Sequence, residues 1–156
     1  MVIFIPQIVP KPVDFDRAQF DAQASNAVSG SRSFAEKYNY SYVATHHLCY
    51  SLLEHDFALQ KVLFRNFDIP LIEFRTKMLE LLPPENNARP FNLPTTKQLW
   101  NVYMNASTFA RSKNRFANVE DLFNGLIRHR EKTVDSLFAY FGVRITSQFT
   151  LEDLNS

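Results

Sequence analysis

Glycine is scarce in this sequence, with only three residues among 156. Sandwiches and barrels of β-strands need many tight turns, which glycine makes at little steric cost. The scarcity therefore argues against an all-β fold. The sequence also contains one cysteine, Cys49, so no disulfide can form within the chain. A single cysteine fits a reducing compartment.

Long apolar runs and an excess of one charge are also missing. No apolar run approaches the ~20 residues that a membrane-spanning helix needs. The 17 Lys and Arg nearly balance the 16 Asp and Glu, which gives no general attraction to nucleic acid or to an anionic membrane. The apolar residues 1–12 lack a basic start and are interrupted by prolines, unlike a signal peptide. We therefore expect a cytoplasmic protein that contacts no membrane.

Hydrophobic residues, by contrast, are plentiful. They make up 46% of the sequence and include 15 Phe. This composition is typical of a folded protein rather than a disordered chain. A length of 156 residues suits one compact domain with a sizeable core. Aromatic residues this abundant usually fill such a core or an interface.

Apolar residues recur at three- and four-residue steps, which is the spacing of one helix face. Thr45 and Asn118 are predicted to cap two helices, because their side chains can accept a backbone N–H bond. Gly142 is predicted to end the last helix in a left-handed conformation. In the first half, helices are predicted from about Phe20 to a loop at 39–44, from Thr45 onward, at 57–67 and at 70–82. In the second half, they are predicted from Thr95 or Thr96 onward, after Asn118 and at 132–141.

The two halves of the helical region repeat each other. Matching residues lie 75 positions apart in the first helix of each half and 74 positions apart further on, so one loop differs by one residue. Such matches, in order and in equivalent predicted helices, indicate a repeated unit that buries its apolar face against its twin. The matched segments are 33–35 with 108–110, 52–55 with 126–129, and Phe64, Phe67 and Ile69 with Phe138, Phe141 and Val143.

Proline-rich stretches divide the chain around these repeats. The prolines of the first twelve residues forbid a regular helix there. The stretch 83–90 contains adjacent prolines and cannot continue a helix. We predict an extended N-terminal arm at 1–19 and a single helical domain at 20–156. Within it lie repeat one (20–82), a linker (83–94) and repeat two (95–154).

With this repeat, the sequence resembles the N-terminal domain of Clp-type AAA+ unfoldases. That domain begins the second helix of each repeat with a Gly-Thr-Glu-His-type tetrapeptide followed by apolar residues. Residues 44–52, Ala-Thr-His-His-Leu-Cys-Tyr-Ser-Leu, and residues 118–126, Asn-Val-Glu-Asp-Leu-Phe-Asn-Gly-Leu, occupy this position. Residues 67–69 and 141–143 match the turn that ends the following helix. The resemblance covers about residues 20–154 and implies an all-α fold of two tandem, pseudo-symmetric four-helix repeats.

The resemblance also implies where a partner binds. Some members of the family bind phosphorylated arginine or other degradation signals through the Glu of each tetrapeptide. The candidate peptide-binding residues here are Thr45, His46, Val119 and Glu120. Only Glu120 keeps a carboxylate that can accept two hydrogen bonds from a guanidinium, which the imidazole of His46 cannot do. An arginine-type signal is therefore not expected at the first half-site.

The pattern gives little support to catalytic or metal sites. No Gly-rich loop ends in Gly-Lys-Ser/Thr, so we expect no ATPase activity and no cofactor. His46 and Cys49 lie three residues apart and could share a metal ion, but no second cluster completes a tetrahedral set. A structural, buried Cys49 is favoured over a nucleophile because its predicted helix face is apolar.

Two further patterns are candidates for contact with a partner. Arg111, Lys113 and Arg115 form a basic patch, followed later by Arg128 and Arg130. It could meet phosphates or an acidic partner, or be a solvated helix end. Aromatic residues in excess could line an exposed groove, or some could pack between the repeats. These aromatic residues are Phe4, Phe15, Phe20, Tyr38, Tyr40, Tyr42, Trp100, Tyr103 and Phe149.

Two functions fit these observations. The first is a stand-alone adaptor, decoy or regulator of proteolysis that binds a Clp unfoldase, its adaptor or its substrates. Such a protein would act in a bacterial cell or a virus-infected host cell. The second is a structural or assembly protein that forms homo-oligomers through the apolar segment 2–9. Nucleic-acid binding through the basic patch is disfavoured by the nearly neutral charge.

Overall fold

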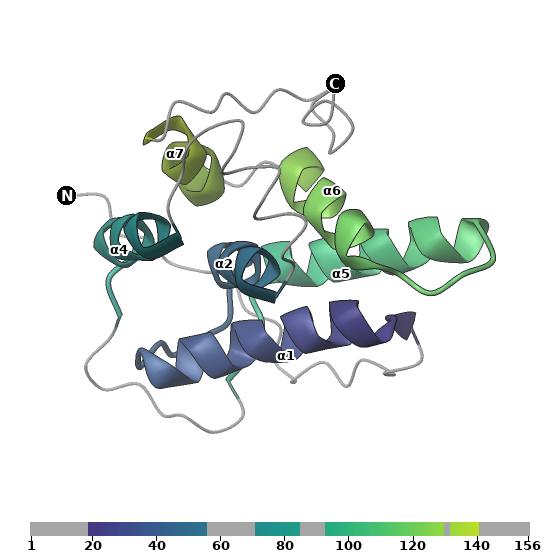
Figure 1. The fold of residues 1–156 in the computed structure, drawn as a ribbon, viewed down its shortest axis with the longest axis horizontal. Coiled ribbons are helices and arrows are strands. Elements are labelled where there is room, and N and C mark those ends of the chain that lie inside the picture. Colours follow the sequence, from purple (N-terminus) through teal and green to yellow (C-terminus); the bar gives the residue numbers. More distant parts are fainter. Residues whose placement is uncertain (1–18, 56–70, 85–92, 130–131, 141–156) are drawn as a thin grey trace.

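The computed structural model describes residues 19–55, 71–84, 93–129 and 132–140, which are mainly helical (Figure 1). The helices are α1 (Ala22–Lys37), α2 (Thr45–His55), α4 (Leu71–Leu81), α5 (Lys97–Ser112), α6 (Val119–His129) and α7 (Lys132–Tyr140). Within these ranges no strand is formed, and two isolated β-bridges join loops instead. The same ranges contain no helix with the length and apolar character needed to cross a membrane.

The ends of α1 and α5 are built in the same way. Asp21 and Thr96 cap the two helices, each accepting a hydrogen bond from the backbone N–H three residues later, at 2.8 and 3.2 Å. Both helices lead into an asparagine with positive φ, Asn39 at 61° and Asn114 at 56°. Asparagine tolerates this conformation better than most residues. The amide after each asparagine then bonds back to the last turn of its helix, at 2.9 and 3.1 Å.

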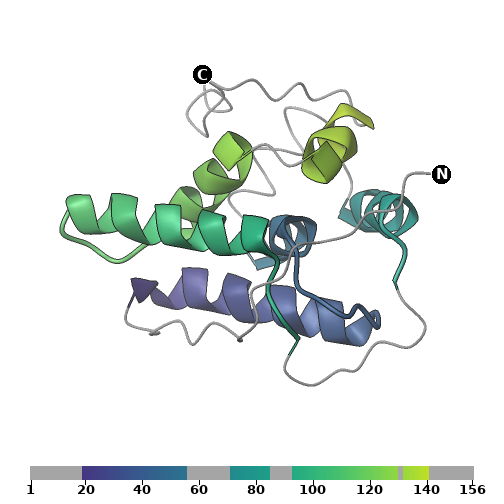
Figure 2. The same cartoon turned by 180° about the vertical axis from the view of Figure 1, so that it is seen from behind.

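Two β-bridges, each with one residue in each repeat, join the two repeats. Phe20, before α1, pairs with Ala117, before α6, and Val43, before α2, pairs with Thr95, before α5. Two backbone hydrogen bonds of 2.9 Å accompany each bridge. The helices α1 and α5 lie side by side and run in opposite directions (Figures 1 and 2). Each repeat therefore helps to position the start of the second helix of the other.

Small residues let the first two helices of each repeat approach closely. Ser51 of α2 donates a hydrogen bond to the Ala27 carbonyl of α1 at 2.5 Å. At the equivalent place in repeat two, a Cβ added to Gly125 of α6 would lie 3.2 Å from the Val102 side chain of α5. One cluster of buried side chains runs through both repeats around these contacts. Helices α4 and α7 add two aromatic rings whose centroids lie 5.8 Å apart.

The structure confirms the all-helical double repeat and the helix starts at Thr96 and Asn118. The predicted cap at Thr45 is wrong by one residue. Thr45 is the first residue of α2, and Ala44 takes the cap position, because its carbonyl accepts the Leu48 N–H at 3.3 Å. The arm apart from Gln19, most of the linker, the helix predicted at 57–67 and Gly142 lie outside the described residues. The proposed domain boundaries stay a prediction.

Candidate functional site

A reciprocal pair of hydrogen bonds fixes the start of α6. The Asn118 side chain accepts a bond from the Asp121 N–H at 2.9 Å, and the Asp121 carboxylate accepts one from the Asn118 N–H at 3.0 Å. This capping box satisfies two backbone donors that a helix start leaves unpaired. The buried Asp121 carboxylate also accepts two hydrogen bonds from Arg115, which raise the pKa of that guanidinium. Arg115 is therefore held against the start of α6.

Replacing Asp121 with alanine should lower the free energy of unfolding by about 1–2 kcal/mol, because the capping bond and the contact with Arg115 are lost together. Urea unfolding followed by circular dichroism measures this loss. Asp121→Asn should cost less, since an amide oxygen still accepts the Asn118 N–H. Glu120→Ala is the matched control, because Glu120 is the exposed neighbour of Asp121 in the sequence. An equal loss in the Asp121→Ala and Glu120→Ala variants would contradict the proposed role of the cap.

The start of α2 keeps only half of this arrangement. His47 occupies the position of Asp121, and its Nδ1 accepts the Ala44 N–H at 2.9 Å. Ala44 occupies the position of Asn118, but it has no side-chain oxygen to accept a bond in return. At the start of α2 an imidazole therefore accepts the backbone N–H of the cap residue. At the start of α6 a carboxylate accepts the equivalent N–H.

His46 and His47 lie in the protein interior. Both are 0% exposed, with ring centroids 4.0 Å apart, and both rings pack against Tyr40. The two ring nitrogens of His46 and Nε2 of His47 have no hydrogen-bond partner among the described residues. Burial lowers the pKa of His46 to about 3. Burial and the nearby His46 also lower the pKa of His47. Both imidazoles are therefore neutral at physiological pH.

The four sequence-predicted site residues open α2 and α6 at equivalent positions of the two repeats. Their side chains differ in exposure: Thr45 (1%), His46 (0%) and Val119 (5%) are buried, whereas Glu120 is exposed. Glu120 and Asp21 both raise the pKa of Arg115 through their charges, although less than Asp121 does. The start of α1 thus adds a carboxylate to the start of α6. Of the four residues, Glu120 alone has a side chain exposed to solvent in this structure.

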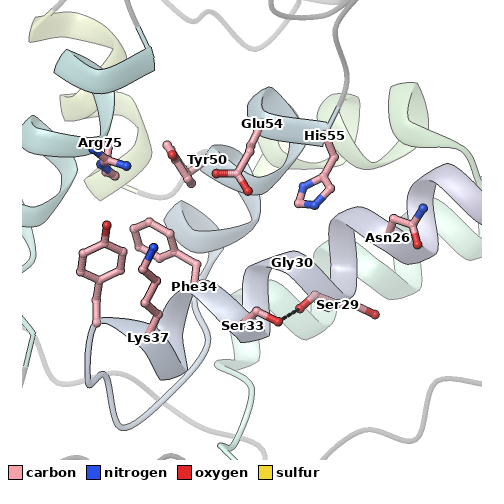
Figure 3. Close-up of a pocket in the computed structure, with 11 residues that line it drawn as sticks. Asn26, Ser29, Gly30, Ser33, Phe34, Lys37, Tyr50, Glu54, His55 and Arg75 are labelled. Atoms are coloured by element: carbon pink, nitrogen blue, oxygen red, sulfur yellow. Dashed lines mark hydrogen bonds between the residues drawn. The ribbon is translucent and has the colours of Figure 1, made fainter.

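A groove of about 370 Å³ lies on repeat one, between α1, α2 and α4, and we call it the α1–α2 groove (Figure 3). It is lined by Phe34, which is 7% exposed and packs against Tyr38 and Tyr50, with ring centroids 4.5 and 4.8 Å away. Glu54 and Arg75 flank Tyr50 in the same groove. Burial and the hydrogen bond with Glu54 raise the pKa of Tyr50. The groove is therefore lined by aromatic rings of this chain, with charged groups among them.

Repeat two carries an equivalent groove of about 230 Å³ between α5 and α6, which we call the α5–α6 groove. It is lined by Phe109, which lies 75 positions after Phe34 and is 46% exposed. Asn124 replaces Tyr50 at its wall, and Arg128 replaces Glu54. The two grooves therefore share their position in the repeat but differ in charge and in the exposure of the central phenylalanine.

The structure corrects the predicted exposed aromatic groove. Phe20, Tyr40, Tyr42 and Tyr103 are buried, whereas Tyr38 and Trp100 are partly buried. Tyr103 packs between the repeats, 3.4 Å from the Ser31 hydroxyl. Phe4, Phe15 and Phe149 lie outside the described residues. The exposed aromatic side chains of the described part are instead Phe109, Phe116 and Tyr140.

Sequence reasoning missed Phe109 because the repeat alignment pairs it with Phe34 and so treats the two phenylalanines as equivalent. A comparison of the neighbours in the alignment could have detected the difference, since the tyrosines next to Phe34 have no aromatic counterparts in repeat two.

The other candidates from the sequence are placed as follows. Cys49 is fully buried, and burial raises the pKa of its thiol to about 12, so the reactive thiolate is not populated. The described residues contain no group of three or more His, Cys, Asp and Glu side chains that could hold a metal ion. Arg111, Lys113 and Arg115 are exposed at the end of α5 and in the loop that follows, and Arg115 is paired with Asp121.

Solved structures with the same fold come from several organisms. The N-terminal domain of the caseinolytic protease-associated chaperone ClpD from Arabidopsis thaliana superposes with a TM-score of 0.71 at 17% identity, over 92% of this chain and 99% of that one. The Hsp104 N-terminal domain from Candida albicans gives 0.67 at 12% identity, over 81% and 84%. A protein described as part of a malarial protein secretion system gives 0.66 at 16% identity, over 88% and 92%.

At these identities the structural likeness shows the fold. No curated protein gives a significant sequence match. The sequence model of the Clp repeat (R) N-terminal domain matches residues 19–141, which include every described helix. The β-bridges between the repeats, the equivalent helix caps and the tetrapeptides at the starts of α2 and α6 all lie within this match. The chain therefore belongs to the Clp repeat (R) N-terminal domain family.

Proposed function

We propose that this protein is a non-catalytic binding module that recognises a protein or peptide partner and acts as an adaptor, decoy or regulator of proteolysis. In unfoldases the Clp N-domain binds substrates and adaptors. The observation that carries the proposal for this chain is the exposed Glu120 carboxylate on the first turn of α6, at the tetrapeptide that resembles the binding motif of the family. The expected partners are a Clp unfoldase, its adaptor or its substrates.

The charges around Glu120 favour a cationic group on the partner. Asp21, Glu120 and Asp121 all act on the guanidinium of Arg115. Asp121 already binds Arg115 directly, so Glu120 can accept hydrogen bonds from an incoming guanidinium or ammonium group. Such charge-assisted bonds are stronger than bonds between neutral groups. The site thus suits an arginine or lysine side chain of a degradation signal.

The first half-site does not offer the same chemistry. His46 stands where the resemblance places a carboxylate, and it is buried and neutral. We therefore propose that recognition depends on repeat two, with Thr45, His46 and Val119 holding the starts of the two helices in place.

Affinity capture with the intact protein tests this proposal. We expect a Clp unfoldase, its adaptor or a degradation substrate to be retained by the wild type, and lost at least tenfold with Glu120→Ala, because the accepting carboxylate is gone. Mass spectrometry quantifies the captured proteins. Glu73→Ala is the matched control, because Glu73 is exposed and lies in the first turn of another helix, α4.

Capture by the wild type and by Glu73→Ala but not by Glu120→Ala would support the proposed function. Absence of any Clp component, adaptor or degradation substrate would count against it. Equal capture by Glu120→Ala and the wild type would exclude the Glu120 site.

A further inference from the structure

The α1–α2 groove shows how repeat one covers its own central phenylalanine. Phe34 lies on α1, and Tyr50 of α2 packs against it with their ring planes inclined at 47°. Tyr38, just after α1, adds a second ring. Pairs of aromatic rings at these separations are more stable than their buried area alone predicts. Phe34 is consequently 7% exposed.

The α5–α6 groove has the same phenylalanine without its cover. Asn124 stands in the place of Tyr50, and Lys113 in the place of Tyr38. Phe109 makes no ring-to-ring contact with another aromatic residue in the described part of the chain, and it is 46% exposed. An isolated exposed phenylalanine is common in proteins. This one differs because the equivalent phenylalanine of repeat one is covered by a tyrosine ring, whereas Phe109 is not.

The charges around Phe109 are positive. The ammonium of Lys113 lies 5.8 Å from the centre of its ring, and the guanidinium of Arg115 lies 5.9 Å away. Arg128 lines the groove beside it. Asp121 also lines the groove, but its charge is matched by Arg115. Lys113 and Arg128 form no ion pair with a carboxylate in the described part of the chain, so each adds an unpaired positive charge beside Phe109.

The size of the groove limits what it can hold. Pockets for small-molecule ligands usually measure about 300–1,000 Å³, and this groove measures about 230 Å³. A single large side chain of a partner suits it better than a whole ligand. Repeat one indicates which kind, because there an aromatic ring packs on the equivalent phenylalanine.

We propose that the α5–α6 groove binds an acidic peptide segment of a partner, which packs an aromatic side chain on Phe109 and places carboxylates beside Lys113 and Arg128. This inference deepens the proposed function and rests on it. The occupant is a peptide rather than a nucleic acid because the chain is nearly neutral overall and Glu120 is exposed next to the groove. A nucleic acid carries a phosphate at every nucleotide and binds through broad basic surfaces, which a nearly neutral chain does not offer.

Fluorescence anisotropy with a labelled acidic peptide, Glu-Asp-Glu-Tyr-Glu-Asp-Glu, tests the proposal on the full chain. The wild type should bind this peptide. Two control peptides should bind at least tenfold more weakly: one with Ala in place of Tyr, and one with Lys and Arg in place of the acidic residues. Asn124→Tyr, which should cover Phe109 as Tyr50 covers Phe34, should weaken binding at least tenfold. The double variant Lys113→Glu and Arg128→Glu should do the same.

Lys97→Glu makes a similar charge change at the exposed start of α5, three turns from Phe109, and should leave affinity within twofold. Circular dichroism checks that each variant is folded. If Asn124→Tyr fails to fold, the charge variant decides alone, because Lys113 and Arg128 are both exposed. Equal binding of the acidic and basic peptides, or unchanged binding by the folded variants, would overturn the proposal. Phe109-dependent binding of a thymidine oligonucleotide in place of the peptide would also overturn it.

The two proposals fail in different ways. Capture of a Clp component that depends on Glu120, without any binding of the acidic peptide, would refute the groove and leave the proposed function intact. Failure of capture together with failure of peptide binding would refute both. Peptide binding should survive Glu120→Ala, because Glu120 does not line the groove.

Discussion

Acidification from pH 7 to pH 5 should lower the free energy of unfolding by roughly 2 kcal/mol through His46, and protonation of His47 should add to this loss. Both are fully buried and carry pKa values below the ordinary value of 6.5, with His46 at about 3. In the unfolded chain they bind protons below pH 6.5, while the folded protein resists binding them. Stability is therefore complete above about pH 6.5 and is lost as the pH falls towards the folded pKa. The combined loss is a large part of the stability of a typical small domain.

Urea unfolding at a series of pH values measures this effect. The slope of stability against pH between 6 and 4.5 reports how many more protons the unfolded state binds. His46→Leu should reduce that slope by about one proton. It should also preserve stability at pH 7, because it removes two buried nitrogens that have no hydrogen-bond partner among the described residues.

His55→Gln is the matched control, because this histidine is exposed at the end of α2. A smaller slope in His46→Leu than in this control would assign the effect to the buried ring. An unchanged slope in His46→Leu would show that His46 takes up its proton without unfolding. That result would contradict the burial argument.

Gly30→Ala should destabilise the protein by about 2 kcal/mol, although alanine is the better helix former by up to about 1 kcal/mol. A Cβ at Gly30 would lie 2.5 Å from the Ser51 hydroxyl and would also clash with the His55 ring. The exposed His55 ring can rotate away, although it then loses its hydrogen bond with the Ser51 carbonyl. Ser51 cannot move freely, because it is buried and donates a hydrogen bond to the Ala27 carbonyl.

Ser51→Gly should rescue much of this loss. Repeat two already has this arrangement, with Asn105 in the place of Gly30 and Gly125 in the place of Ser51. A double-mutant cycle measured by chemical unfolding compares the losses in free energy of unfolding. The loss in the double variant should be smaller than the summed losses of the two single variants by about 1 kcal/mol or more. If the losses of the two single variants simply add, the crossing of α1 and α2 does not require a small residue at one of these two positions.

The fold could be predicted from sequence because its signals are local and occur twice. Thr96 and Asn118 satisfy the backbone at the starts of α5 and α6 through their own side chains, so their role depends on nearby residues. The matching spacings of the two halves indicated one unit used twice. The same local reasoning misplaced the cap of α2, because His47 accepts the Ala44 N–H in place of a capping oxygen.

The candidate site needed the tertiary structure. Sequence spacing placed His46 and Glu120 at equivalent positions, but one is buried and the other exposed. Burial of His46 depends on Tyr40, which the turn after α1 brings against both histidine rings. No local pattern around His46 shows that contact.

The two phenylalanines illustrate the same limit. The sequence alone determined the double repeat, the all-helical fold and the single carboxylate of the tetrapeptides, because periodicity, capping and residue identity are properties of neighbouring residues. The tertiary structure decided that Phe34 is covered and Phe109 half exposed. The physical reason is that the rings or charges around each phenylalanine come partly from the other helix of its repeat, and only packing brings those residues together.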